Sequence, residues 1–192
     1  MLTTMNEVLK IAEARNIAVG AFDTPNLENM FAVVKTAEKY NVPVILMYIP
    51  LLEDVAPVEF MAPVMVAVAR NAKVPVAVHL DQCSDLERLK RCLELGFTSV
   101  MYDASAKSFE ENAEETKEIV KIAHAVGASV EAELGHIFTS EVVHGEGGSA
   151  DSKDDYDDLD DIYTDPEVAK KFVELTGVDC LAVAFGTTHG VY

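Results

Sequence analysis

Short apolar segments alternate with amphipathic segments along this chain, and the alternation constrains the fold more than any other feature. The apolar segments carry few polar residues on either face, as strands do when both faces of their sheet are covered. The amphipathic segments repeat apolar residues every three or four positions, which is the pattern of surface helices. A parallel β-sheet covered by helices is therefore the expected fold class.

Six strands and six helices are expected. The strands are expected at residues 17–22, 42–49, 74–80, 98–102, 128–134 and 179–184. The helices are expected at residues 4–16, 26–40, 57–71, 84–95, 108–126 and 166–176. Thr4 with Glu7, and Ser108 with Glu111, have the spacing of capping boxes. Pro63 is expected to kink or split the third helix.

Two architectures fit this order: an open doubly wound sheet and a (β/α)₈ barrel. No GxGxxG or GxxxxGKS/T motif follows a strand, which argues against the usual dinucleotide and triphosphate sites. Polar or charged residues instead lie at the ends of several strands. These residues are Asp23, Asp81 with Gln82, Asp103, Glu133 and His189. Barrels build their sites from the ends of many strands, so the sequence favours the barrel.

The charge balance bears on partners and location. The chain has 33 acidic and 15 basic residues, a formal charge of −18, which argues against nucleic acid or an anionic membrane as partner. No apolar run reaches the roughly 18 residues of a membrane span, and no signal peptide is visible. Cys83, Cys92 and Cys180 are odd in number and lack CxxC spacing, which favours the cytoplasm over a disulfide-forming compartment.

One loop, at about residues 135–164, holds much of the negative charge. Seven aspartates lie between residues 151 and 161. Such a segment is expected to be a solvated, mobile loop. A lid over the barrel mouth is the alternative, because long loops are often functional.

Five segments, in chain order, carry a resemblance to a known enzyme family. They are VGAFDTPNLENM (19–30), VAVHLDQ (76–82), SVMYDAS (99–105), VEAELG (130–135) and VAFGTTHGVY (183–192). They resemble the class II, metal-dependent ketose-bisphosphate aldolases, the fructose- and tagatose-bisphosphate family, and YTDP (163–166) also matches. The resemblance spans essentially the whole chain. It implies a TIM barrel that reversibly cleaves a ketose 1,6-bisphosphate to dihydroxyacetone phosphate and an aldehyde such as glyceraldehyde 3-phosphate.

The chemistry of this cleavage defines the groups that the site needs. Breaking a carbon–carbon bond beside a carbonyl leaves an enediolate, whose charge a divalent metal can stabilise as a Lewis acid. One carboxylate must move a proton on the hydroxyl of the other fragment, and a second must exchange the proton at the enediolate carbon. Metal ligands and two carboxylates should therefore converge at one barrel mouth.

The resemblance implies roles for individual residues. Asp81 matches the carboxylate that handles the hydroxyl proton, and Glu141, with Glu146 as its rival, matches the second catalytic carboxylate. His189 matches a metal-binding histidine. The other implied positions are Gln82, Asp103 and Glu133 as metal ligands, and Gly190 and Asp23 as substrate-binding residues, Gly190 lying near a phosphate or a monovalent cation.

The residues themselves leave alternatives open. Asp81 could instead serve as a turn residue or a helix cap. Asp103 and Glu133 could be partners for buried polar groups, and Gly190 could be a simple turn glycine. His189 has the alternative of a structural or solvated histidine. His79 is expected to be a core residue or a support for the site.

Three departures from the family pattern matter. Gln82 stands where the family usually has a metal-binding histidine, and its carbonyl oxygen suits hard cations better than zinc. Asp23 stands where asparagine is common. The chain also ends after the sixth expected strand, whereas a full barrel has eight strands and about 250 residues.

We therefore expect residues 1–192 to form one partial barrel domain of about six βα units, either a fragment or a chain completed by another. The resemblance implies a divalent metal, zinc in this family, a phosphorylated sugar substrate and a homodimer or homotetramer. A non-catalytic aldolase-like subunit is the main alternative. A different barrel enzyme, such as a phosphosugar isomerase or epimerase, is a weaker one.

Overall fold

The computed structural model describes residues 1–135 and 163–186. Its centre is one curled sheet whose main path has the order β2-β3-β4-β5-β6-β7, with every neighbouring pair parallel. The strands of this path are β2 Ala21–Asp23, β3 Val44–Tyr48, β4 Val76–Cys83, β5 Ser99–Tyr102, β6 Ser129–Leu134 and β7 Cys180–Val183. A short strand that the sequence did not predict, β1 Leu2–Thr3, pairs with β4.

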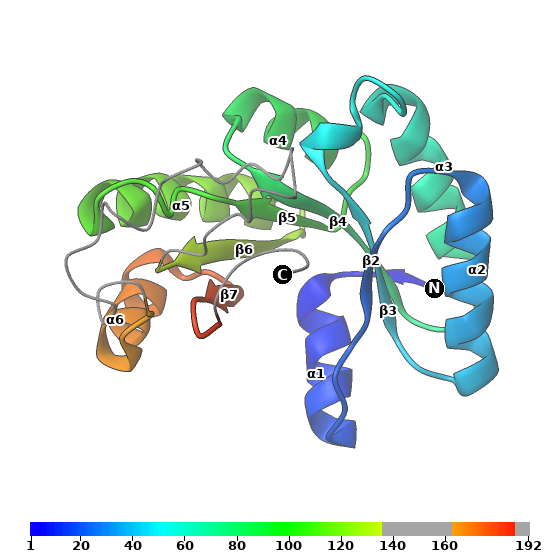
Figure 1. Cartoon of the computed structure of the whole chain (residues 1–192), viewed down its shortest axis with the longest axis horizontal. Coiled ribbons are helices and arrows are strands. Elements are labelled where there is room, and N and C mark those ends of the chain that lie inside the picture. Colours follow the sequence, from blue (N-terminus) through cyan, green and yellow to red (C-terminus); the bar gives the residue numbers. More distant parts are fainter. Residues whose placement is uncertain (136–162, 187–192) are drawn as a thin grey trace.

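Helices lie on both faces of the sheet (Figure 1). They are α1 Met5–Arg15, α2 Leu27–Tyr40, the 3₁₀ turn η1 Pro50–Leu52, α3 Val58–Asn71, α4 Leu86–Glu94, α5 Phe109–Ala125 and α6 Pro166–Thr176. The expected alternation of six strands and six helices is confirmed, with shifts of a few residues at the boundaries. No helix within the described residues is long and apolar enough to cross a membrane.

The two faces of the sheet are distinguished by the side chains that alternate along each strand. On β4, Val76, Val78 and Leu80 belong to the large core beneath the outer helices. Ala77 points to the other face, where it packs with Met5 and Val8 of α1. The concave face therefore carries Ala77 and the residues in phase with it, and α1 fills its amino end.

The sheet does not close within the described residues. Edge strands β2 and β7 each pair with a single neighbour. All three residues of β2 are exposed, so the expectation of a buried first strand is wrong. The reason is its edge position, because no described strand or helix covers its free side. The architecture is an incomplete (β/α)₈ barrel, as expected.

Local signals in the helices are mostly confirmed. Ser108 and Glu111 form a complete capping box, and Thr4 accepts a hydrogen bond from the Glu7 amide. Pro63, in contrast, does not split its helix, since α3 runs without interruption across it. Proline removes one internal hydrogen bond, and the apolar face that α3 buries against the sheet holds the helix together.

Candidate functional site

Four carboxylates gather at the carboxyl ends of β4, β5 and β6. Asp81 lies near the carboxyl end of β4, and Asp103 directly follows β5. Glu131 and Glu133 lie two residues apart on β6. Asp81 is four residues after Ala77 and therefore shares the concave face. Besides burial, Asp103, Glu131 and Asp81 each raise the pKa of Glu133 electrostatically. The expected convergence of strand-end carboxylates is thus found for three adjacent strands.

A bulge in β4 sets the position of Asp81. The pairing register between β4 and β5 shifts between Leu80 and Cys83, and Gln82 has a φ of 45°, in the left-handed region. Non-glycine residues rarely adopt this conformation, and bulges of this kind redirect side chains beside active sites. The alternative that Asp81 caps a helix is excluded, because Asp85 is the N-cap of α4.

Burial among like charges perturbs the two glutamates of β6. Burial first, and then Asp103, raise the pKa of Glu133 to about 7, with Glu131 and Asp81 acting in the same direction. Burial also raises the pKa of Glu131, while the nearby His79 opposes that shift. Perturbed carboxyl groups in a cluster are typical of functional sites.

His79 lies beneath Asp81 on the same face of β4. It is 1% exposed, and its Nδ1 lies 2.8 Å from Ser99 Oγ. Its Nε2 lies 3.7 Å from Asp81 Oδ1 and 3.4 Å from Glu131 Oε2. His79 is therefore a core residue in contact with the carboxylate cluster, which agrees with its expected supporting role.

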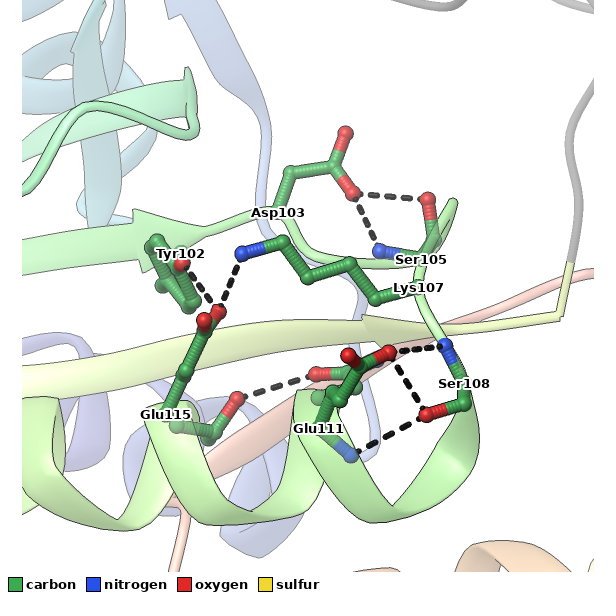
Figure 2. A network of polar contacts seen from close by, with 9 residues as sticks. Tyr102, Asp103, Ser105, Lys107, Ser108, Glu111 and Glu115 are labelled. Carbon is green, nitrogen blue, oxygen red and sulfur yellow. Dashed lines mark hydrogen bonds and ion pairs between the residues drawn. The ribbon is translucent and has the colours of Figure 1, made fainter.

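Asp103 stabilises the loop between β5 and α5. Its Oδ1 accepts hydrogen bonds from the amide and the hydroxyl of Ser105, at 3.0 and 2.7 Å, while its other oxygen points away from the loop (Figure 2). Behind it, Tyr102 and Lys107 both donate to Glu115, at 2.6 and 2.5 Å. Asp103 thus serves as a partner for the polar groups of Ser105, which is only partly buried, whereas the alternative named buried polar groups.

The expected metal ligands do not assemble a site by themselves. Within residues 1–135 and 163–186, no group of three histidine, cysteine, aspartate or glutamate side chains is arranged to hold a metal ion. Gln82, Asp103 and Glu133 would bind a metal only through oxygen atoms, whereas zinc favours nitrogen and sulfur. These residues alone therefore do not fit a resident zinc ion.

Several expected site residues fall elsewhere. Glu141, Glu146, His189 and Gly190 lie outside the described residues, as does most of the acidic loop. Asp23 is the last residue of the exposed edge strand β2. It pairs with Met47 of β3, which in turn pairs with His79 of β4. It belongs to the same end of the sheet as Asp81.

Glu131 and Ser99 were not among the predicted site residues. The signal for Glu131 was available, because a residue two positions before Glu133 on a strand faces the same side. Ser99 carried no comparable signal, because its contact with His79 depends on the pairing register of β4 and β5.

A curled parallel sheet with helices around it and polar residues at the carboxyl ends of its strands is the architecture of the (β/α)₈ barrels. Within that class, the chain belongs to the family described as fructose-bisphosphate aldolase class II, whose profile matches residues 3–192. It is 45% identical to a fructose-bisphosphate aldolase of Thermus caldophilus, covering all of this chain and 59% of that protein. It is 39% identical to the fructose-bisphosphate aldolase of Giardia intestinalis, covering 55% of that protein.

Solved structures agree with this assignment. The YdjI aldolase from Escherichia coli K12 matches all of this chain with a TM-score of 0.83 and 35% identity. A putative fructose-1,6-biphosphate aldolase from Coccidioides immitis matches 99% of it, with a TM-score of 0.84 and 33% identity. In both cases the match covers 63% of the solved chain. The chain thus spans less than two thirds of these relatives.

Proposed function

We propose that the protein containing this chain is a metal-dependent aldehyde-lyase of carbohydrate metabolism, including glycolysis. It cleaves a ketose 1,6-bisphosphate of the fructose or tagatose type, reversibly, to dihydroxyacetone phosphate and an aldehyde such as glyceraldehyde 3-phosphate. Family membership across the whole chain supports this function. The observation that carries it is the position of Asp81, at a bulged strand end within a cluster of carboxylates.

Asp81 moves the hydroxyl proton in this proposal. In the cleavage direction, its carboxylate takes the proton of the C4 hydroxyl while the C3–C4 bond breaks and the C4 carbonyl forms. In the reverse direction, it returns that proton to the aldehyde oxygen as the bond forms. A second carboxylate, Glu141 or its rival Glu146, exchanges the proton at C3.

A divalent metal, zinc by resemblance, belongs to the proposal, and in this family it supplies Lewis-acid stabilisation of the enediolate. Its ligands must come in part from outside the described residues, with His189 as the first candidate. We place Gly190 near a substrate phosphate or a monovalent cation, and Asp23 near the substrate. We further propose a cytoplasmic homodimer or homotetramer that binds neither nucleic acid nor membrane.

A coupled aldolase assay tests the function, using protein expressed from the complete reading frame that contains these residues. Asp81→Asn should lower kcat about 10²- to 10⁴-fold, the usual contribution of a general acid–base group. Asp85→Asn is the matched control, because asparagine caps helices as well as aspartate does. Activity that survives both metal chelation and Asp81→Asn would refute the proposal.

A non-catalytic aldolase-like subunit is the second candidate. Gln82 in place of a histidine favours it, as does the lack of a three-ligand cluster within the described residues. Metal analysis of the purified protein separates the two functions. A protein that binds no divalent metal at micromolar concentration supports the non-catalytic subunit.

A further inference from the structure

His79 has a buried nitrogen that the proposed reaction does not yet use. Its imidazole is held on one side by Ser99, whose Oγ lies 2.8 Å from Nδ1. On the other side, Nε2 is buried without a hydrogen-bond partner, and it is the one buried side-chain atom of the described residues in this condition. A buried polar atom without a partner is costly, so its surroundings need an explanation.

The atoms nearest to Nε2 that bear charge are carboxylate oxygens. Asp81 Oδ1 lies 3.7 Å away and Glu131 Oε2 lies 3.4 Å away. Both carboxyl groups present oxygen atoms that can accept a hydrogen bond from Nε2–H. The stable tautomer therefore carries its hydrogen on Nε2, and Nδ1 accepts the hydrogen of the Ser99 hydroxyl. The Ser99 hydroxyl can donate or accept, so the carboxyl groups select the tautomer and Ser99 stabilises it by donating to Nδ1.

We infer that His79 is a positioning residue for Asp81, an inference that rests on the proposed aldolase function. A movement of about 1 Å brings Asp81 Oδ1 within hydrogen-bond distance of Nε2–H. With Oδ1 held in this way, Oδ2 is the oxygen that meets the substrate hydroxyl. Orientation matters here because a displacement of about 1 Å can lower the rate 10²-fold.

The position of Asp81 explains why it needs such support. It lies where β4 departs from regular pairing, next to Gln82 in its left-handed conformation. The ladder of hydrogen bonds that orients residues earlier in the strand is interrupted there. His79, by contrast, lies in the regular part of β4, opposite Ser99 in the register. His79 is therefore held in place by the regular part of the sheet, and its hydrogen bond would restrain Asp81 at the irregular end of β4.

Steady-state kinetics of four variants test the inference. Ser99→Ala and His79→Leu should lower kcat about 10- to 100-fold, which is the effect of one hydrogen bond to a charged group. KM should stay within about threefold, because positioning acts on the chemical step. His79→Gln retains an N–H donor and should recover about tenfold of the loss.

Ser129→Ala is the matched control. Ser129 is also buried and lies opposite Ser99 on β6, but its Oγ accepts a hydrogen bond from the backbone amide of Asn6 instead. The substitution removes the same atom and leaves His79 with its partner, so kcat should be that of the wild type. If His79→Leu does not fold, Ser99→Ala decides the test, because it removes a single hydroxyl.

Nitrogen NMR of ¹⁵N-histidine-labelled protein adds a readout that a purely structural role would not move. The chain has five histidines, and the His79 signals are those lost in His79→Gln. We expect a protonated Nε2 and an unprotonated Nδ1 in the wild type, and a mixture of tautomers in Ser99→Ala. A wild-type His79 protonated on Nδ1 alone would overturn the inference.

The outcomes separate this inference from the proposed function. If the wild type is active and the Ser99 and His79 variants keep its kcat, the positioning role fails and the aldolase function stands. If the wild type has no aldolase activity, the function fails, and the role of His79 in it fails too. Loss of kcat in Ser99→Ala, but not in Ser129→Ala, supports both.

Discussion

Replacing Glu133 by glutamine should stabilise the metal-free protein near pH 8 and have much less effect near pH 5. Glu133 is 5% exposed, and burial together with Asp103, Glu131 and Asp81 raises its pKa from 4.5 to about 7. The folded state therefore favours the protonated form. This favourable contribution is complete below pH 4.5 and is lost as pH rises through about 7.

The size of the effect follows from the shift. About 2.5 pKa units at 1.36 kcal/mol each amount to about 3 kcal/mol. Glutamine is neutral at every pH and has nearly the same shape, but its amide needs a partner of its own. We therefore expect the free energy of unfolding of Glu133→Gln to exceed that of the wild type by about 2–3 kcal/mol at pH 8.

Urea unfolding followed by circular dichroism measures this difference at pH 5, 6, 7 and 8, with a chelator in every buffer. Glu114→Gln, at an exposed position of α5, is the control and should stay within about 0.5 kcal/mol of the wild type. An advantage of Glu133→Gln that is equal at pH 5 and pH 8 would refute the reasoning. So would a variant less stable than the wild type at pH 8.

Three further predictions concern the rest of the fold and the metal. Asp179→Ala should lower the free energy of unfolding by about 3–5 kcal/mol. Asp179 accepts hydrogen bonds from Asn6 Nδ2 and from the Val130 amide, at 2.9 and 2.8 Å. A loss below about 1 kcal/mol in urea unfolding would contradict this prediction. Leu89→Ala, at a fully buried position of α4, should cost about 2–5 kcal/mol in the same assay, and an unchanged midpoint argues against the packing described. Gln82→His should raise zinc affinity at least about tenfold in a competition assay, since zinc favours imidazole nitrogen, and equal affinity would show that position 82 does not contact the metal.

The order of strands and helices was predictable because each element carries its own local signal. The capping box at Ser108 and Glu111 and the helical spacing of apolar residues depend on neighbours within a few positions. Pro63 was misjudged for the same reason. Its local effect is unfavourable, but contacts between α3 and the sheet, distant in sequence, keep the helix whole.

The candidate site was predictable only in part. Asp81 and Glu133 could be named because they occur at strand ends in segments that resemble a family. Glu131 could have been named from its spacing to Glu133 on one strand. Ser99 could not, because its importance comes from a contact across strands. Whether Asp81 capped a helix was likewise open until the structure showed Asp85 in that position.

By itself, the sequence determined the class of fold, the parallel direction of the strands and the family. These follow from periodicity and from motifs whose residues are adjacent in the chain. Only the tertiary structure decided that β2 is exposed, that β4 bulges at Gln82, and that a buried His79 faces Asp81 and Glu131. Pairing register and burial set these features, because both depend on segments far apart in sequence. The raised pKa of Glu133 has the same origin, since burial is its main cause and the charges that add to it come from three strands or their ends.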